Sequence, residues 1–289
     1  MTAAARPMHR VTTVAALRKA LAPWRARGQS VAFVPTMGAI HDGHLSLVRR
    51  ARRSAGKVVA SIFVNPLQFG PSEDFARYPR PLRADRARFA AAGVDLLWEP
   101  AVATIYPAGD RTRVRVAGLT ESLEGAARPG HFEGVTTVVM RLLHAVQPDV
   151  LWLGQKDAQQ ATVLERMCTD LLVPVRVRRG ATVRERDGLA MSSRNAYLSA
   201  DERAQATALW VGLRAARARL VAGERSASRV AAAVRAELKR RPLVREEYIA
   251  VVDATTLEPV KTVRGRVLVA VAARVGPARL IDNFEWSAR

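Results

Sequence analysis

An apolar strand that leads through a glycine-containing turn into a helix is the feature that most constrains the fold of this chain. Residues 31–34 are all apolar, which predicts a buried strand. From Gly43 onward the apolar residues return at intervals of three and four, which predicts a helix. The turn between them carries the polar groups and holds two histidines, His41 and His44.

The turn at residues 35–44 has the properties of a phosphate site. The first N–H groups of a helix lack partners within it, and the peptide dipoles leave a partial positive charge there, so an anion binds readily. Gly38 and Gly43 let the backbone approach a polyphosphate closely. The imidazoles of His41 and His44 can donate hydrogen bonds to charge that develops during phosphoryl transfer. The alternative, which an isolated H-x-x-H pair favours, is that both are ordinary turn and helix-cap residues.

Length and cysteine content indicate a cytoplasmic enzyme with two domains. The 289 residues suit two unequal domains with a substantial apolar interior. The single cysteine, Cys168, excludes an intrachain disulfide and indicates a reducing compartment. Residues 1–10 lack the apolar stretch of a signal peptide, and no apolar run is long enough to span a bilayer. We therefore expect a cytoplasmic protein without a membrane partner.

The net charge of +20, from 46 basic and 26 acidic residues, suggests nucleic acid as a candidate partner. The arginines are, however, scattered over nearly every predicted helix, and only five of the basic residues are lysine. No basic run alternates with aromatic residues that stack bases. We expect no nucleic-acid partner, because the scattered arginines and the heavy use of alanine resemble a genome-wide composition bias. A second interpretation is that the positive charge raises the local concentration of anionic substrates.

Strands alternate with helices over the first 180 residues, a pattern that predicts an α/β fold with a doubly wound parallel sheet. The predicted strands lie at residues 31–34, 58–64, 94–98, 113–116 and 149–153, followed by a further segment at 174–177. The predicted helices lie at residues 13–27, from 44 onward, at 82–92, up to 146 and at 158–172.

The character of the sequence changes beyond residue 184. Residues 201–241 predict two alanine-rich amphipathic helices broken near Gly223, and strands are predicted at residues 248–252 and 267–271. These elements predict a smaller α+β domain. We expect the first domain to comprise residues 1–182 and the second to comprise residues 183–289.

Two amide side chains follow the predicted strand at residues 58–64. Asn65 and Gln68 lie where that strand ends, and ligands of open parallel sheets bind at this edge. Amides donate and accept hydrogen bonds, which suits a small substrate that is uncharged or carries a carboxylate. Turn or cap residues are the alternative for both.

The segment at residues 154–160 again joins an apolar strand to a helix. Lys156 supplies a compact charge suited to phosphate oxygens. Gln160 follows Asp157 by about one helical turn and can face the same cleft. The alternative is that Lys156 and Asp157 form a surface ion pair of little energetic consequence.

A fourth polar segment occupies residues 187–195, at the predicted domain junction. Ser192, Ser193 and Arg194 suit a mobile phosphate clamp, because a guanidinium can bind phosphate in a bidentate way and serines can add short hydrogen bonds. Taken alone, the segment is equally an ordinary linker.

Together the four segments resemble the family of pantoate–beta-alanine ligases, or pantothenate synthetases, within the nucleotidyltransferase superfamily with its H-x-G-H signature. The resemblance covers about residues 30–200. Its motifs, in family order, are PTMGAIHDGH, SIFVNPLQF, EDFARYPR, RPGHFEGV, GQKDAQQ and DGLAMSSRN. An isolated H-x-G-H would indicate only an adenylyl-transferring enzyme, whereas the ordered set indicates this family.

The resemblance implies a Rossmann-like first domain, a smaller C-terminal domain that acts as a lid, and a homodimer. It implies ATP as cosubstrate, with Mg²⁺ bound mainly through the ATP phosphates. His44 would be the proton-donating catalytic residue, assisted by His41, Lys156 and Arg194. The residues that would line the ATP site are Met37, Gly38, Ala39, Ile40, His41, Asp42, Gly43, His44, Gly154, Gln155, Lys156, Asp157, Val183, Met191, Ser192, Ser193 and Arg194.

Gln68 and Gln160 would hold pantoate, with Gln68 also near beta-alanine and Asn65 beside them as a further substrate-binding residue. The implied activity is the ATP-dependent condensation of pantoate with beta-alanine through a pantoyl adenylate. Two alternatives stay open: an adenylyltransferase that forms no amide, and a nucleic-acid binder driven by charge. Pantoate-dependent exchange of pyrophosphate into ATP tests the first, and a salt titration of nucleic-acid binding tests the second.

Overall fold

Two compact units make up the chain in the computed structural model, which describes residues 8–71 and 73–287. Unit 1 comprises residues 1–154 and 160–181, and unit 2 comprises residues 155–159 and 182–289. The expectation that a signal peptide is absent concerns residues 1–10, of which residues 1–7 lie outside the described part. Within the described part, no helix combines the length and the apolar character needed to cross a membrane.

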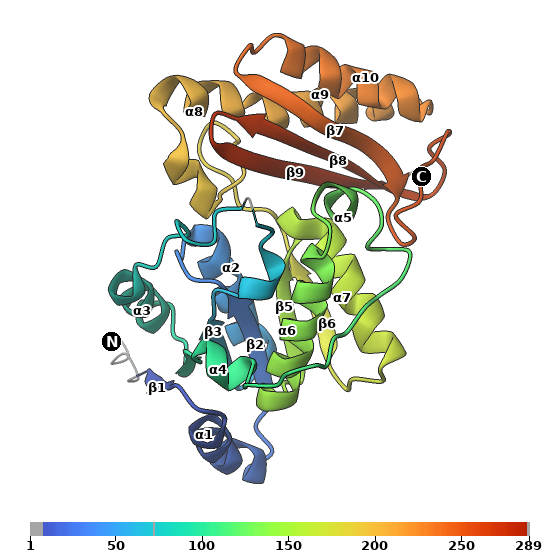
Figure 1. The fold of residues 1–289 in the computed structure, drawn as a ribbon. Helices are drawn as coiled ribbons and strands as arrows, with labels where there is room; N and C mark the ends of the chain where they lie inside the picture. Colours follow the sequence, from blue (N-terminus) through green and yellow to red (C-terminus); the bar gives the residue numbers. More distant parts are fainter. Residues whose placement is uncertain (1–7, 72, 288–289) are drawn as a thin grey trace, which may run out of the picture. The chain divides into compact units, whose positions relative to one another are not determined.

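A parallel sheet forms the centre of unit 1, as predicted (Figure 1). Its six strands among the described residues pair in the order β1-β4-β3-β2-β5-β6, and every pair is parallel. The strands are β1 (His9–Val11), β2 (Val31–Thr36), β3 (Lys57–Ile62), β4 (Leu96–Trp98), β5 (Val150–Gly154) and β6 (Arg176–Gly180). The edge strand β1 is absent from the sequence prediction.

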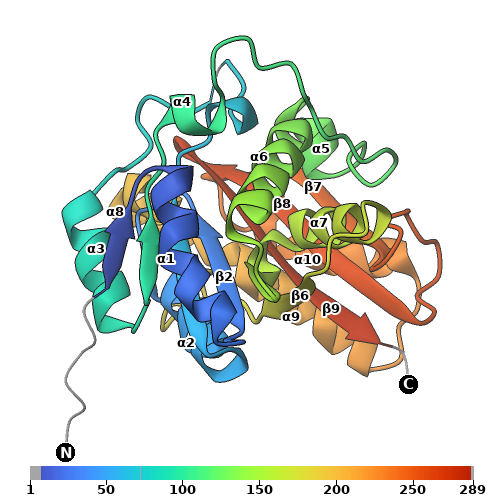
Figure 2. The same cartoon turned by 90° about the horizontal axis from the view of Figure 1, so that it is seen from below.

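Helices cover both faces of this sheet, because successive residues of its central strands point to opposite sides. In β2, Val31 and Phe33 pack into the apolar cluster that also holds residues of α1, α6 and α7, whereas Ala32 and Val34 pack into the cluster with residues of α2 and α3 (Figure 2). The helices of unit 1 are α1 (Val14–Ala26), α2 (Asp42–Ser54), α3 (Leu82–Ala91), α4 (Val102–Ile105), α5 (Glu124–Ala127), α6 (His131–Val146) and α7 (Ala158–Asp170), the last of which begins within unit 2.

The strand predicted at residues 113–116 is wrong: the chain there belongs to no sheet. The backbone groups of Val114 are bound by side chains of α6 instead. The N–H of Val114 donates to Thr137 Oγ1 over 3.0 Å, and Thr136 Oγ1 donates to the carbonyl of Val114 over 2.5 Å. Threonine hydroxyls therefore replace a neighbouring strand as the partners of this extended segment.

The only cysteine of the chain, Cys168, is buried on α7. Burial raises the pKa of its thiol to about 11, so the thiolate that reacts with oxidants and electrophiles is disfavoured. Cys168 packs in the apolar cluster formed by buried side chains that include those of α6 and α7.

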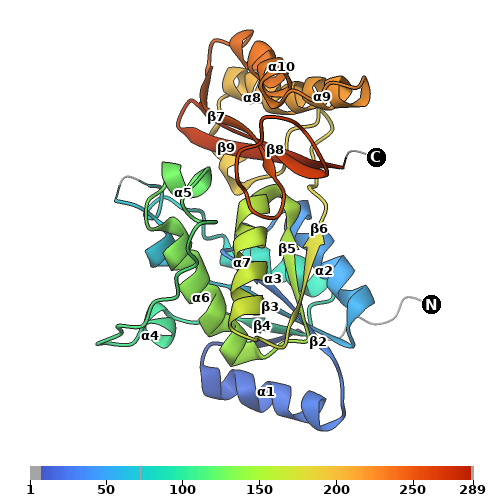
Figure 3. The same ribbon diagram turned by 90° about the vertical axis from the view of Figure 1, so that its right-hand side faces the viewer.

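Unit 2 is a three-stranded antiparallel sheet with helices packed against it, which agrees with the predicted α+β class (Figure 3). The strands are β7 (Val244–Asp253), β8 (Arg266–Val275) and β9 (Ala278–Ser287). The helices are α8 (Ala200–Ala206), α9 (Ala208–Val221) and α10 (Ala227–Lys239). The predicted break near Gly223 is present, and a second break at Thr207 divides the first predicted helix in two.

Strand β9 is missing from the sequence prediction. Polar residues interrupt its apolar pattern at Asp282, Asn283 and Glu285, although Asp282 and Asn283 are buried. Their side chains bind groups of unit 2 that are far away in the sequence, as described below, so their burial does not follow from local hydrophobicity.

Candidate active site

Three of the predicted segments begin at one edge of the sheet of unit 1. The neighbouring strands β3, β2 and β5 are parallel, so their carboxyl ends lie at the same edge. Strands β3, β4 and β1 extend from one side of β2, and β5 and β6 extend from the other. The order reverses between β2 and β5, and such a switch point is where open parallel sheets bind ligands.

The two histidines of the turn after β2 cap the helix α2 reciprocally. His41 is the N-cap, and its Nδ1 accepts the backbone N–H of Gly43 over 3.1 Å. Nδ1 of His44 accepts the backbone N–H of His41 over 3.4 Å, and the ring centroids lie 4.1 Å apart. A neutral imidazole that accepts at Nδ1 carries its proton on Nε2. The capping role that the sequence left as an alternative is real, and it is compatible with a donor role because the two roles use different nitrogens.

The glycines of this turn meet two different requirements. Gly38 has a φ of +88°, which side chains rarely adopt, and a Cβ there would lie 3.1 Å from Asp85 Oδ2. Gly43 has no such backbone requirement, but a Cβ there would lie 2.7 Å from Cε1 of His41. Gly43 therefore makes room for the His41 ring.

Helix α3 fixes the turn through two residues that the sequence analysis missed. Asp85, only 1% exposed, accepts the N–H groups of Ala39 (2.9 Å) and Ile40 (2.8 Å). Arg88, one turn further along α3, donates to the carbonyl of Ile40 over 2.5 Å. The available signal was the spacing of three between opposite charges in a predicted helix, which is more commonly a surface pair.

The amide of Gln68 joins the second predicted segment to the first. Gln68 ends the short 3₁₀ helix η1 (Pro66–Gln68), which Asn65 caps by accepting the N–H of Leu67. Nε2 of Gln68 lies 2.8 Å from Sδ of Met37. The structure thus places a predicted acid-binding side chain against a predicted ATP-binding residue.

A buried histidine of the RPGHF motif holds the backbone of Gln68. The Nη1 group of Arg128 donates to Nε2 of His131 (3.0 Å), so Nδ1 carries the proton and donates to the carbonyl of Gln68 (2.8 Å). Arg128 also donates to both carboxylate oxygens of Glu73, at 2.7 and 2.6 Å. Burial, and next the charge of Arg128, lower the pKa of His131 to about 4, so the imidazole is neutral near pH 7.

In unit 2, three residues predicted for the ATP site form the short 3₁₀ helix η2 (Gln155–Asp157). A residue of β9 binds two of its backbone carbonyls. The side-chain amide of Asn283 donates to the carbonyls of Gln155 (3.1 Å) and Lys156 (2.8 Å). Nζ of Lys156 lies 3.6 Å from Oδ1 of Asp157, so the ion pair that the sequence left as an alternative is present. A pair of this kind between partly exposed groups contributes little to stability and leaves the ammonium able to bind phosphate.

The other predicted ATP-site residues of unit 2, Val183 and residues 191–194, lie in the segment 183–194. Asp282 of β9 binds this segment through Arg184. Met191 donates its N–H to the carbonyl of Val183 over 3.0 Å, and Ser192 Oγ accepts the N–H of Arg194 over 3.2 Å. Arg184 binds both carboxylate oxygens of Asp282, at 2.5 and 3.0 Å. Burial raises the pKa of Asp282, and the hydrogen bond from Arg184 opposes that rise.

The predicted site residues are therefore divided between the two units. In unit 1 the residues of the histidine turn, Asn65 and Gln68 form one connected group, with Gly154 ending β5 at the same edge. Gln160 lies in the first turns of α7, the helix that follows β5. In unit 2 the residues around Lys156 and those around Arg194 each depend on one of two consecutive residues of β9.

A doubly wound sheet with a helix N-terminus and two imidazole donors at its switch point defines an α/β enzyme of the nucleotide-binding class. The family model described as pantoate–beta-alanine ligase matches residues 9–285, and the chain belongs to this family.

Known members of the family match nearly the whole chain. The pantothenate synthetase of Moorella thermoacetica is 52% identical over 276 residues, which cover 96% of this chain and 98% of the relative. That of Syntrophotalea carbinolica is 52% identical over 259 residues, which cover 90% of this chain and 92% of the relative.

Solved structures agree with the fold. The crystal structure of pantothenate synthetase from Thermus thermophilus superimposes with a TM-score of 0.92 at 50% identity, covering 96% of this chain and 99% of the other. That of the pantoate–beta-alanine ligase from Francisella tularensis, complexed with beta-gamma ATP and beta-alanine, gives 0.78 at 30% identity, covering 96% and 97%.

Proposed function

We propose that the protein condenses pantoate with beta-alanine at the expense of ATP, giving pantothenate, AMP and pyrophosphate. Its membership of the pantoate–beta-alanine ligase family supports this activity, as does the Francisella structure complexed with beta-gamma ATP and beta-alanine. The observation that carries the proposal is the contact of Gln68 Nε2 with Met37 Sδ at 2.8 Å. An amide donor suited to an organic acid thereby borders the turn that is suited to a polyphosphate.

The first step is adenylation of pantoate. A carboxylate oxygen of pantoate attacks the α-phosphorus of ATP, and the bond from that phosphorus to the bridging oxygen of the β-phosphate breaks, so that pyrophosphate leaves with the electron pair. His44 and His41 donate hydrogen bonds through Nε2 to the phosphoryl oxygens as charge accumulates on them. Lys156 and Arg194 act on the same charge with permanent positive groups, and Ser192 and Ser193 add hydroxyl donors.

The second step forms the amide. The amine nitrogen of beta-alanine attacks the carbonyl carbon of pantoyl adenylate, the bond from that carbon to the phosphate oxygen of AMP breaks so that AMP leaves with the electron pair, and the amine nitrogen releases a proton to solvent. Gln68 and Gln160 hold the pantoyl group, and Gln68 lies near the incoming amine. The other residues of the proposed ATP site are Met37, Gly38, Ala39, Ile40, Asp42, Gly43, Gly154, Gln155, Asp157, Val183 and Met191.

Magnesium fits this site as an ion carried by ATP. The turn after β2 presents the Nε2 donors of His41 and His44, which bind phosphate oxygens and not cations, whereas the backbone N–H groups of His41 and Gly43 are bound by the two Nδ1 atoms. No group of three or more histidine, cysteine or acidic side chains that could hold a metal ion occurs among the described residues. When bound to the phosphates, Mg²⁺ neutralises part of their charge.

We further propose that the enzyme is a cytoplasmic homodimer without a nucleic-acid partner. The family resemblance supports the dimer, and the single buried cysteine is consistent with a reducing compartment. Light scattering after size-exclusion chromatography tests the dimer, and a mass near the 31.5 kDa of one chain would contradict it. Salt-dependent titration with DNA and RNA tests the absence of a nucleic-acid partner.

Two measurements on the purified protein test the reaction. With ATP, Mg²⁺ and pantoate alone, we expect labelled pyrophosphate to exchange into ATP, because adenylation is reversible. On addition of beta-alanine, we expect AMP and pantothenate to form in equal amounts. Exchange that does not require pantoate, or AMP transfer to another acceptor without amide formation, would instead indicate a different adenylyltransferase.

A further inference from the structure

The orientation of the Asn65 amide is determined by two backbone groups. Its Oδ1 accepts the N–H of Leu67 over 3.3 Å, and its Nδ2 donates to the carbonyl of Gly134 over 3.0 Å. A backbone N–H can only donate and a carbonyl can only accept, so the oxygen and nitrogen of this amide cannot be exchanged. Asn65 is 1% exposed, so water does not replace these partners.

The roles of two further side chains follow from this orientation. Tyr106 contacts Oδ1 of Asn65 over 2.7 Å, and because that oxygen has no proton, the tyrosine hydroxyl must be the donor. Gln68 receives the second Nδ2 proton of Asn65 over 3.1 Å, so the Gln68 atom at this contact is its oxygen. The amide nitrogen of Gln68 consequently points the other way, toward Met37. Asn65 thus uses all four of its hydrogen-bonding positions within the protein.

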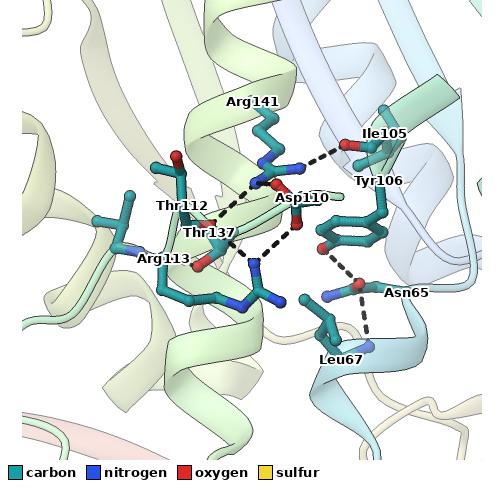
Figure 4. A network of polar contacts seen from close by, with 10 residues as sticks. Asn65, Leu67, Ile105, Tyr106, Asp110, Thr112, Arg113, Thr137 and Arg141 are labelled. Carbon is teal, nitrogen blue, oxygen red and sulfur yellow. Dashed lines mark hydrogen bonds and ion pairs between the residues drawn. The ribbon is translucent and has the colours of Figure 1, made fainter. Parts of the chain in front are cut away.

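The ring of Tyr106 packs against a charged cluster, while its hydroxyl bonds Asn65 (Figure 4). The guanidinium of Arg141 lies 4.8 Å from the centre of the tyrosine ring and donates to the carbonyl of Ile105 over 2.6 Å. Arg141 also binds Asp110 (2.5 Å), which accepts from Arg113 (2.7 Å). Burial raises the pKa of Tyr106 to about 12, so the hydroxyl remains a donor throughout the range in which the enzyme is assayed.

We propose that Tyr106 is a positioning residue for the organic acid: through Asn65 it holds the Gln68 amide so that the N–H of Gln68 that is not directed at Met37 faces an acceptor oxygen of pantoate. The 2.7 Å bond from Tyr106 is the shortest contact of the Asn65 amide, and the bond from Leu67 at 3.3 Å is the longest. The tyrosine therefore contributes most of the restraint on Oδ1. In this proposal Asn65, which the sequence analysis expects to bind substrate directly, acts through Gln68 because all four of its hydrogen-bonding positions are used within the protein. This inference rests on the proposed function.

The decisive variant is Tyr106→Phe, which removes the hydroxyl and keeps the ring beneath Arg141. We expect the pantoate Kd, measured by titration calorimetry, to rise about fivefold, the equivalent of one hydrogen bond. The ATP Kd should stay the same, because the histidine turn is untouched. Tyr248→Phe, the same change in β7 of unit 2, is the matched control and should leave both constants unchanged.

A double-mutant cycle separates positioning from a general structural role. In a Gln68→Ala background, Tyr106→Phe should change the pantoate Kd by less than about twofold, because the group through which the tyrosine acts is gone. Equal effects of Tyr106→Phe in the two backgrounds would overturn the proposal. Gln68→Glu tests the amide orientation, since it places an oxygen where the donor nitrogen lies. It should weaken pantoate binding at least as much as Gln68→Ala, and tolerance of Gln68→Glu would also overturn the proposal.

Two arms keep the test decisive. If Tyr106→Phe does not fold, Arg141→Lys is tested in its place, because it retains the tyrosine hydroxyl but weakens the contact that holds the ring. Arg141→Lys should raise the pantoate Kd and leave the ATP Kd unchanged. An unchanged pantoate Kd would count against the proposal. The parent protein is assayed in parallel for pantoate-dependent exchange of pyrophosphate into ATP. Absence of exchange in the parent contradicts the proposed function, whereas exchange in the parent with parental pantoate affinity in Tyr106→Phe contradicts only the role of Tyr106.

Discussion

His41 folds back over Gly43, so that its Nδ1 accepts the Gly43 N–H at 3.1 Å and its Cε1 lies only 2.7 Å from the place a Gly43 Cβ would occupy. The cap of α2 and the direction of the His41 ring are therefore one structural feature. A side chain at position 43 cannot be added without moving the ring.

Replacement of Gly43 by alanine should consequently act on chemistry more than on folding. We expect Gly43→Ala to lower the rate of pantoate adenylation by at least about tenfold, because the His41 donor moves away from the phosphates. Single-turnover formation of AMP measures this rate. Gly56→Ala is the control: its Cβ would come no closer than 3.6 Å to any atom beyond its chain neighbours, and we expect a parental rate. A parental rate for Gly43→Ala as well would show that the ring direction is unimportant.

His44 is proposed to donate a hydrogen bond to the charge that develops during adenylation, and its loss should be more severe than that of Gly43. Removal of one preorganised donor to a transition state costs about 3 kcal/mol, or roughly a hundredfold in rate. We expect His44→Ala to slow pantoyl adenylate formation by this factor while the protein keeps its fold, since capping by His41 is retained. Exchange of pyrophosphate into ATP measures the step directly. Formation of the adenylate at the parental rate would remove His44 from the mechanism.

The backbone of α6 at Gly134 lies directly against η1. A Cβ at this position would be 2.3 Å from the carbonyl oxygen of Leu67 and 2.7 Å from the N of Gln68. Neither atom is the end of a flexible side chain, so the helix or the turn must shift. We expect Gly134→Ala to lower the free energy of unfolding by about 1–3 kcal/mol. We also expect it to raise the pantoate KM by a much larger factor than the ATP KM. Chemical denaturation and steady-state kinetics check the two parts; equal changes in both KM values would contradict the second.

The parts of the candidate site that are local in the chain could be predicted from the sequence as structural elements. The histidine turn is contained within ten residues, and its strand, glycines and helix start each have a recognisable pattern. The order of elements then brings residues after β2, β3 and β5 to one edge, since parallel strands place their carboxyl ends together. Fold class and the first two segments follow from such rules.

The supporting residues could not be predicted, because their partners are remote in sequence. Asp85 binds backbone groups 45 and 46 residues away, and Asn283 binds the carbonyl of Lys156 across 127 residues. Tyr106 is a single aromatic residue outside any motif that the sequence analysis used. A side chain that satisfies a distant backbone group leaves no periodic pattern, and the same holds for the threonines of α6 that replace a strand at Val114.

Asn283 offers a test of unit 2 that does not disturb unit 1. Its amide is the donor to the carbonyls of Gln155 and Lys156, so Asn283→Ala should release the backbone that carries the Lys156 ammonium. We expect the ATP KM to rise about tenfold, which corresponds to one or two hydrogen bonds, with little change in the pantoate KM. Glu285→Gln, which keeps an acceptor for Gln155 two residues along β9, is the control. A rise confined to the pantoate KM would contradict the assignment of η2 to ATP.

His131 makes the stability of unit 1 depend on pH in a defined direction. Its pKa is about 4 in the folded protein and near 6.5 when unfolded, so between these values the unfolded chain binds more protons. The free energy of unfolding must therefore fall as the pH is lowered from about 6.5 to 4, by at most about 3 kcal/mol from this group. The protonated ring would carry a proton on Nε2 facing Arg128, while the carboxylates of Glu73 and Glu124 oppose this repulsion.

The variant His131→Asn isolates this contribution. Asparagine does not titrate, and its amide nitrogen can replace Nδ1 as the donor to the Gln68 carbonyl. We expect the variant to be less stable than the parent at pH 7 and to lose less stability between pH 7 and pH 4.5, as urea unfolding at a series of pH values would measure. If the free energy of unfolding changed equally with pH in the two proteins, His131 would take up no proton on unfolding. The assignment of a neutral imidazole between Arg128 and Gln68 in the folded protein would then be wrong.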